Sequence, residues 1–522
     1  MHKCDFLIVG SGLAGLYCAI ELAQTKSNKK ITIVTKQTTL SGNTTLAQGG
    51  IAVPNSSTDK NAHYSDTILA GDGLCNKKAV RMLVNNADFH FKKLLGYGFS
   101  PDKTLSGLFD LAREGGHTEQ RIYHTKDFTG KTIHELLLQQ ALHYKNITIV
   151  ENVFAVDLLL TPNKQECAGL LVLERARSKF VNYLADATIL ATGGIGQLYA
   201  NTTNHSTATG DGLAMALRAG VKTENLSFVQ FHPTVYVPNT INAGNSFLIT
   251  EALRGQGAII KNKDGVQFLD KYDPRAELAT RDIVSRAITL EQRKTKTDRV
   301  YLDCSTIQNR KLSQHFPLLA ENCKKAKIKA PFNNIPITPA AHYFCGGIKT
   351  NTNGVTSLSR LFSCGETAST GLHGANRLAS NPLTEALVFA ANCAKKVAKV
   401  KPQETELFTT VLTNILSEPL ATPKVKYYKH KLQRIMQHSL SCYTSNFKIK
   451  TALKQIEAVD SEINSKLFCE SVPHLELRNI LAASKAITIA YQKQKTNMGC
   501  YYNVSNTTTL GKSMTNGKPN YD

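Results

Sequence analysis

The stretch CDFLIVGSGLAGLYCAIELA, residues 4–23, decides the fold of this chain. Phe6–Val9 is an apolar run of the length expected for a buried parallel strand, and the residues after Gly15 repeat apolar side chains at helical spacing. Between them, Gly10, Gly12 and Gly15 have the G-x-G-x-x-G spacing of a dinucleotide-binding turn. Such glycines permit a tight bend, the close approach of a pyrophosphate and the packing of helix on strand, and the helix N-terminus attracts phosphate. The stretch therefore predicts a nucleotide site in a parallel α/β sheet.

The composition is that of a soluble globular protein, with 42% hydrophobic and 20% charged residues among 522. Apart from residues 4–23, no segment is apolar for long enough to span a membrane, and Asp5 disfavours a signal peptide there. The 12 cysteines are scattered without any C-x-x-C pair, which disfavours a zinc site and a disulfide scaffold. We therefore expect a cytoplasmic protein with reduced thiols and no metal.

The net charge of +22 raises the question of nucleic-acid binding. The basic residues are spread along the chain, and no basic stretch is interleaved with aromatic residues. We therefore expect no nucleic-acid partner. The charge is then either an ordinary solvated surface or a field that attracts anionic substrates.

The second expected strand, Ile31–Val34, ends without the acidic residue that an NAD site usually has at this point. The chain has Thr35 and Lys36 instead, which weakens the case for NAD. Lys36 is either a contact to a phosphate or ribose, or an ordinary surface lysine.

The next segment, SGNTTLAQGGIA at residues 41–52, is rich in small and hydrogen-bonding residues that can lie flat against a planar ring. Here the chain resembles the flavoprotein family of fumarate reductases, succinate dehydrogenases and L-aspartate oxidases, in which this segment lies along the flavin of FAD. Membrane-bound members have a histidine that carries covalent flavin where Asn43 stands, so the resemblance implies non-covalent FAD. It assigns FAD contacts to Gly10, Gly12, Leu13, Ala14, Gly15, Lys36, Asn43, Thr44, Thr45, Leu46, Ala47, Gln48, Gly49, Gly50, Asp211, Glu366, Pro382 and Leu383. Asp211 has an alternative role as the N-cap of a helix.

The motif REGGH, residues 113–117, places charged side chains beside paired glycines, as in a loop pressed against a ligand. Dicarboxylate dehydrogenases of the family have an apolar residue before the glycines, whereas the L-aspartate oxidase branch has this pattern. The Glu114 carboxylate can pair with the α-ammonium group of aspartate, which succinate and fumarate lack. A charge-assisted contact of this kind contributes about 1.5–3 kcal/mol.

The pattern along the chain predicts an α/β fold with a Rossmann-like FAD-binding domain, an inserted α+β capping domain and a C-terminal helical domain. Alternating strand and helix signals give way to mixed, turn-rich sequence from about Phe228 to Ala341. We expect the FAD-binding domain at residues 1–228 and 342–402, the capping domain at 229–341 and the helical domain at 403–522. In the last of these, Leu477, Ile480, Leu481, Ser484, Ile487 and Tyr491 form a mostly apolar stripe.

The resemblance is closest to L-aspartate oxidases, and it implies FAD-dependent oxidation of L-aspartate to iminosuccinate. The electron acceptor would be O2, giving H2O2, or fumarate, and the product would pass to quinolinate synthase in NAD biosynthesis. A dicarboxylate needs cationic or hydrogen-bonding partners at both ends. The resemblance assigns these contacts to His232, Thr250, His342 and Arg377. The alternative function is a soluble fumarate reductase or succinate dehydrogenase flavoprotein.

Arg281 matches the proton-transferring arginine of the family, and Glu251 and Arg254 match its relay. An arginine with a pKa above 12 is a poor base, so Arg281 is either a true base or an electrostatic clamp. Glu251 and Arg254 lie three residues apart, on one helix face, and are otherwise a surface ion pair.

Two departures from the family pattern affect the site. Pro382 replaces a serine beside the flavin, which removes a backbone N–H that would contact FAD. In the tail, KTNMGCY at residues 495–501 replaces K-E-S-R-G-x-H, with Met498 and Tyr501 in place of the arginine and the histidine.

Overall fold

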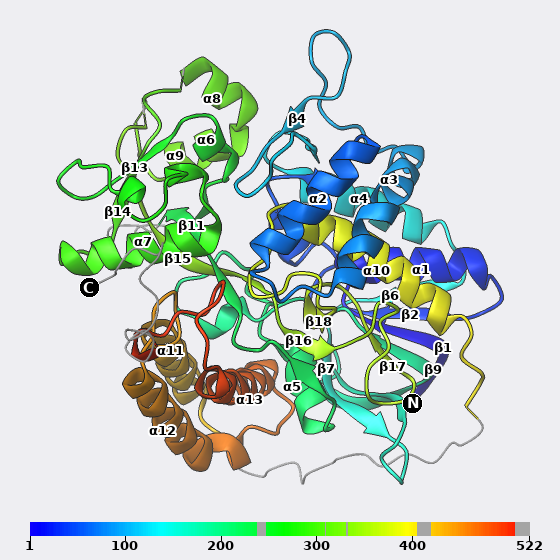
Figure 1. Cartoon of the computed structure of the whole chain (residues 1–522). Helices are drawn as coiled ribbons and strands as arrows, with labels where there is room; N and C mark the ends of the chain where they lie inside the picture. The colour runs from blue at the N-terminus through cyan, green and yellow to red at the C-terminus, as the bar shows by residue number, and fades with distance from the viewer. Residues whose placement is uncertain (237–246, 308, 330–331, 404–418, 507–522) are drawn as a thin grey trace.

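The computed structural model describes the chain except for residues 237–246, 308, 330–331, 404–418 and 507–522 (Figure 1). Its main element is a seven-stranded sheet in the order β6-β2-β1-β9-β8-β7, with β17 also paired to β9. The parallel strands are β1 (His2–Val9), β2 (Ile31–Val34), β6 (Ile147–Val150), β9 (Lys179–Leu190) and β17 (Leu361–Ser363). Two antiparallel strands extend the sheet, β7 (Val153–Leu160) and β8 (Cys167–Glu174). The predicted α/β fold is confirmed.

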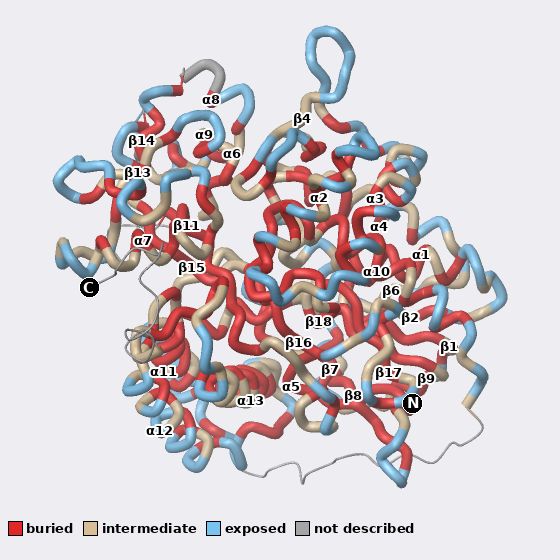
Figure 2. Tube along the Cα trace, in the orientation of Figure 1, coloured by how far each residue is buried: buried red, intermediate tan, exposed pale blue. Residues whose placement is uncertain are grey.

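Helices cover both faces of this sheet (Figure 1). A layer on one face contains α1 (Leu13–Thr25), α2 (Ser57–Ala70), α3 (Lys77–Tyr97), α4 (Thr129–Leu142) and α10 (Asn381–Val397), and α5 (Asp211–Arg218) lies on the other face against β7. Short strands form two small sheets, one of β3 (Ile51–Ala52), β5 (Ile122–Tyr123) and β4 (Leu111–Ala112), the other of β10 (Thr223–Glu224), β16 (Gly347–Lys349) and β18 (Ala368–Ser369). The sheet and its helices enclose a continuous buried core (Figure 2).

The glycines of the first turn are required by close backbone contacts. Gly10 has φ +111°, and a Cβ there would lie 2.3 Å from the carbonyl oxygen of Ala191, the residue after β9. A Cβ at Gly15 would lie 2.0 Å from the carbonyl oxygen of Gly10. The turn therefore holds β1, β9 and α1 in direct contact, which is the packing that the glycine spacing predicts.

A second sheet of five antiparallel strands stands apart from the first (Figure 1). Its strands are β11 (Val229–Tyr236), β12 (Phe247–Leu248), β13 (Ile259–Lys261), β14 (Val300–Asp303) and β15 (Ile335–Phe344). It packs with α6 (Ala252–Gly255), α7 (Arg281–Lys294), α8 (Asn309–His315) and α9 (Pro317–Lys325) around its own apolar core. The long strands β11 and β15 run back toward the main sheet, so residues from this unit reach the cavity described below.

Three helices near the C-terminus form a third unit, α11 (Thr422–Ser439), α12 (Asn446–Ile463) and α13 (Val472–Lys493). All six residues of the predicted stripe on α13 are buried, which confirms it as the seam of this bundle. Among the described residues, no helix is both long and apolar enough to cross a membrane.

Candidate active site

A deep cavity with about 1830 Å³ of empty space, measured out to its opening, lies where strands of the main sheet end. Its lining comes from the ends of β1, β2 and β9, from the Ser41–Gly50 segment and from the start of α10. It continues past these elements to the second sheet, where His232 and Arg281 line it. A cleft at the carboxyl ends of parallel strands is the usual nucleotide position in this class of sheet.

Most residues that the resemblance assigns to FAD line this cavity. They are Gly10, Gly12, Leu13, Ala14, Lys36, Asn43, Thr44, Thr45, Leu46, Ala47, Gln48, Gly49, Gly50, Asp211, Glu366, Pro382 and Leu383. The exception is Gly15, which packs against Gly10 behind the cavity wall and acts in helix packing. The sequence did not single out several further lining residues, among them Asn204, Ala208 and Ser380.

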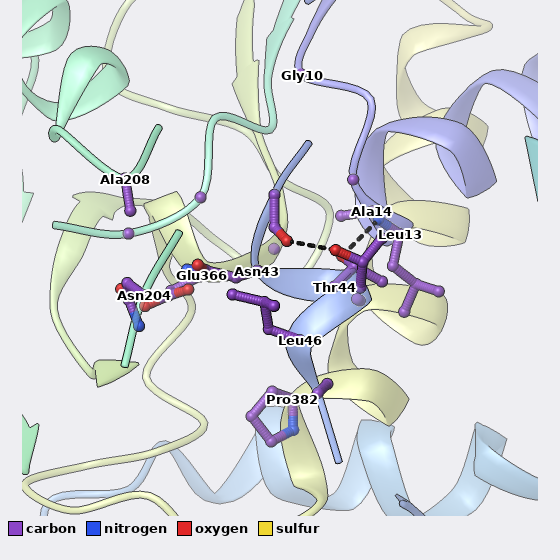
Figure 3. A pocket seen from close by; sticks show the side chains of 18 of the residues that line it. Gly10, Leu13, Ala14, Asn43, Thr44, Leu46, Asn204, Ala208, Glu366 and Pro382 are labelled. Atoms are coloured by element: carbon purple, nitrogen blue, oxygen red, sulfur yellow. Dashed lines mark hydrogen bonds between the residues drawn. The ribbon is translucent and has the colours of Figure 1, made fainter. Parts of the chain in front are cut away.

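The lining fits a dinucleotide. The N-terminus of α1 opens at Gly12, which has no side chain to cap it, so the first-turn N–H groups beyond that of Leu13 are available to phosphate. Thr44 Oγ1 accepts the N–H of Leu13 at 3.2 Å and holds the Ser41–Gly50 segment against this turn (Figure 3). A Cβ at Gly193 would find no described heavy atom within 4 Å, which leaves backbone open to a ligand.

Lys36 is part of a half-buried charge network. Its Nζ lies 2.8 Å from a carboxylate oxygen of Asp211 and 2.8 Å from one of Glu476 on α13. Burial alone would lower the pKa of Lys36, but the two carboxylates outweigh it and raise that pKa. The surface-lysine interpretation is therefore wrong, and so is the N-cap interpretation of Asp211, because Gly210 holds the N-cap position and Asp211 is the first helical residue.

Glu366 and Asn43 lie next to each other on one wall (Figure 3). Glu366 Oε1 accepts the N–H of Phe344 at 3.0 Å, and Asn43 Oδ1 accepts the N–H of His205 at 2.8 Å. Burial raises the pKa of Glu366 to about 7. Near neutral pH this carboxyl group can therefore either donate or accept a hydrogen bond toward a ligand.

Pro382 lines the cavity from the first turn of α10 (Figure 3). The first-turn N–H groups of a helix have no partner within the helix, so proline here costs no helical hydrogen bond. The substitution removes one donor toward the cavity and leaves the helix intact.

The far end of the cavity contains paired arginines and glutamate. Glu251 Oε2 accepts from Arg281 Nε at 2.6 Å, and Glu251 Oε1 accepts from Arg254 at 2.6 Å. Burial alone would raise the pKa of Glu251, but the two guanidinium groups outweigh it and hold that pKa below its ordinary value. Arg254 does not line the cavity; it lies behind Glu251 with its side chain 1% exposed. The alternative of a surface ion pair is therefore wrong.

Two histidines and a threonine complete this end of the cavity, His232, His342 and Thr250. The His232 and His342 rings lie 5.0 Å apart, and His342 Nδ1 lies 2.8 Å from Thr203 Oγ1. Burial, together with the charge of Arg281, holds the pKa of both histidines well below the ordinary value. Both rings are therefore neutral at neutral pH and act as hydrogen-bonding groups.

Glu114 lines the same cavity. Its Oε2 accepts from Ser380 Oγ at 2.6 Å, and the residue is 5% exposed. Burial, with the nearby Glu251 carboxylate, raises the pKa of Glu114. One cavity thus presents a buried carboxylate together with the cations Arg281 and Arg377.

A buried ion network supports the loop that carries Glu114. Arg121 pairs with Asp59 at 2.7 Å and Asp66 at 2.6 Å, and its NH1 lies 2.7 Å from His117 Nδ1. His117 Nε2 in turn lies 2.9 Å from the carbonyl oxygen of Ala379, three residues before Pro382. The sequence did not single out Arg121, because an isolated arginine gives no pattern from which such partners can be inferred.

Three cysteines from distant segments, Cys18, Cys364 and Cys393, come within 4.8 Å of one another in the apolar core. They are the one group of three potential metal ligands found among the described residues. A search for C-x-x-C pairs could not have found this group, because its members are far apart in sequence. All three are at most 1% exposed, and three thiolates in an apolar core would carry a large desolvation cost. We regard them as small apolar core residues.

The chain matches the family described as FAD binding domain over residues 5–383. It is 38% identical to L-aspartate oxidase 1 of Ralstonia nicotianae, over 98% of this chain and 97% of the relative. It is also 38% identical to the L-aspartate oxidase of Yersinia pestis, over 96% of each chain. Among solved structures, it is similar to quinol fumarate reductase FrdA of E. coli, with a TM-score of 0.88 and 27% identity over 97% of this chain and 92% of that one.

Proposed function

The chain belongs to the L-aspartate oxidase family of FAD-binding proteins, and on this premise we propose that it oxidises L-aspartate to iminosuccinate. The acceptor is O2, giving H2O2, or fumarate. The observation that carries the proposal is the far end of the cavity, which combines two guanidinium groups with the buried carboxylate of Glu114. L-Aspartate has the complementary set of charges, two carboxylates and one ammonium group.

The substrate contacts follow from these charges. Arg377 lines the cavity, and a guanidinium group can hold one carboxylate by two parallel hydrogen bonds. His232, His342 and Thr250 line the same end and offer uncharged hydrogen bonds to the other carboxylate. Glu114 binds the ammonium group, and its Ser380 bond fixes the carboxylate for this contact.

FAD supplies the two-electron oxidation when bound, held non-covalently because Asn43 cannot form the bond that a histidine would make. The chain's own residues orient the substrate and exclude water. Arg281 donates to Glu251 in an ion pair of 2.6 Å, so we assign it the role of an electrostatic clamp on the substrate. A true base would have to give up this ion pair in each cycle.

The proposal also divides the chain into three domains. Residues 1–228 and 342–402 form the FAD-binding domain, residues 229–341 a capping domain that closes over the substrate, and residues 403–522 a helical domain. We place the enzyme in the cytoplasm, at the first step of NAD biosynthesis, with its product consumed by quinolinate synthase. The 12 free cysteines fit a reducing compartment.

The test is anaerobic. The purified yellow protein is mixed with L-aspartate and, separately, with succinate, while the flavin absorbance is followed. Bleaching by L-aspartate, with peroxide formed on admitting air, supports the proposal. Bleaching by succinate alone contradicts it and favours a fumarate reductase or succinate dehydrogenase flavoprotein, which the likeness to the E. coli reductase makes the second candidate.

A further inference from the structure

Gln230 connects the two arginines at the substrate end of the cavity. Its Oε1 accepts from Arg377 Nε at 3.0 Å and from Arg281 NH1 at 3.3 Å. Its Nε2 donates to Asn376 Oδ1 at 2.7 Å and to the carbonyl oxygen of Arg377 at 2.8 Å. Guanidinium groups can only donate, so the amide oxygen must face the arginines and the amide nitrogen must face the two acceptors. All of the hydrogen-bonding capacity of this side chain is then used.

The position of Gln230 follows from the strand that carries it. It lies on β11 opposite Tyr343 of β15, and the pairing register shifts between Gln230 and Phe231. Such an irregularity re-aims side chains relative to a regular strand. The Tyr343 ring lies 4.6 Å from the Arg377 guanidinium carbon, so the two facing residues hold Arg377 from two sides.

Gln230 is fully buried and does not line the cavity, so it acts on a ligand only through the arginines. Its carbonyl oxygen carries only a partial charge. Two cations that repel each other are thus held at one point while both keep their charge for substrate carboxylates. A carboxylate at this point would bind the arginines more strongly but would cancel one of the two charges.

We propose that Gln230 is a positioning residue that fixes the separation and orientation of Arg281 and Arg377 for dicarboxylate binding without neutralising them. The inference rests on the proposed function for the identity of the substrate. Asn376 extends the arrangement, because its Nδ2 donates to Asp282 Oδ1 at 2.8 Å, one residue after Arg281. The side-chain amides of Gln230 and Asn376 therefore connect α7, which packs on the second sheet, to the loop that carries Arg377.

The experiment compares Gln230→Leu, Gln230→Glu and a matched control, Gln433→Leu. Gln433 is a buried glutamine of α11 that donates to the carbonyl oxygen of Gln197 at 2.9 Å, far along the chain from the substrate residues. For each protein we would measure kcat and KM for L-aspartate from pH 5 to 8, the Tm, and the affinity for succinate from the change in flavin absorbance.

We expect Gln230→Leu to lower kcat/KM by about 10- to 100-fold and to weaken succinate binding, because the arginines lose their common anchor. Gln433→Leu should keep a kcat/KM within about twofold of the wild type, which is a smaller change than the loss of at least about tenfold expected for Gln230→Leu. Gln230→Glu should bind succinate more weakly than the wild type while its Tm stays close to the wild-type value, because the introduced carboxyl group has the shape of the amide but competes with succinate for the arginines. A purely structural role would weaken succinate binding only together with a lower Tm.

The proposal is overturned if Gln230→Leu keeps the kcat/KM and succinate affinity of Gln433→Leu, or if Gln230→Glu binds succinate as tightly as the wild type. Failure of the proposed function gives a different result. In that case the wild type does not turn over L-aspartate, yet the succinate affinities of the Gln230 variants still report on the arginines.

Discussion

Replacement of Glu114 by glutamine tests how the site selects an amino acid. In the wild type, Ser380 Oγ donates to the Glu114 carboxylate at 2.6 Å. Glutamine has the shape of glutamate and keeps an oxygen that can accept this hydrogen bond, so the loop should stay in place. The only loss is the negative charge. A hydrogen bond between charged groups contributes about 1.5–3 kcal/mol, so kcat/KM for L-aspartate should fall by roughly 10- to 150-fold.

Fumarate should respond in the opposite sense. It has no ammonium group, and the buried Glu114 carboxylate repels its carboxylates. Fumarate reduction by a reduced dye should therefore be unchanged or faster in Glu114→Gln. The control is Glu119→Gln, which removes the same charge from an exposed position five residues later and should affect neither reaction.

The pH dependence gives a second measurement on the same variant. Burial raises the pKa of Glu114, so the wild type should lose affinity for L-aspartate as the pH falls through this raised value and the carboxyl group is protonated. Glu114→Gln should lack this acid limb. The reasoning is refuted if aspartate turnover stays within about twofold of the wild type, far below the predicted loss, or if aspartate and fumarate turnover fall together.

Three further outcomes are expected. Arg281→Leu should abolish L-aspartate oxidation while the protein stays yellow; retained activity would exclude its proposed role. Arg121→Leu should destabilise the protein by about 3–5 kcal/mol, because Asp59 and Asp66 would be left as buried carboxylates without a cation, and an unchanged urea midpoint would contradict this. In the FAD-free protein, Glu366 has a pKa of about 7 against an ordinary 4.5, so the folded state retains a proton that the unfolded chain loses. The free energy of unfolding of the FAD-free protein should therefore fall by about 3 kcal/mol as the pH rises from 4.5 to about 7. In Glu366→Gln, the Tm should not show this part of the pH dependence.

The local features of the fold could be predicted from the sequence because they depend on neighbouring residues. The strand, the glycine turn and the helix at residues 4–23 occur as expected, since the contact between Gly15 and Gly10 is made within one turn. The buried stripe of α13 follows from helical periodicity in the same way. The motifs around Asn43 and Glu114 identified the family, and the resemblance then gave the expected cofactor and substrate residues together.

The sequence-based interpretations that failed concern charged residues whose role depends on which side chains from other parts of the chain lie next to them. Lys36 and the pair Glu251 and Arg254 were compatible with an exposed surface, yet Lys36 is half-buried in ion pairs and Glu251 and Arg254 are fully buried, because charged partners arrive from other elements of the chain. Glu476, a partner of Lys36, is 440 residues away in sequence.

By itself, the sequence determined the α/β class, the nucleotide turn and the family, because periodicity and spacing record contacts between close neighbours. Only the tertiary structure decided the roles of Gln230 and Arg121, the ion pairs of Lys36 and the gathering of Cys18, Cys364 and Cys393. The physical reason is that the energy of a buried charge or amide depends on partners that folding brings together from distant segments. No local pattern contains that information.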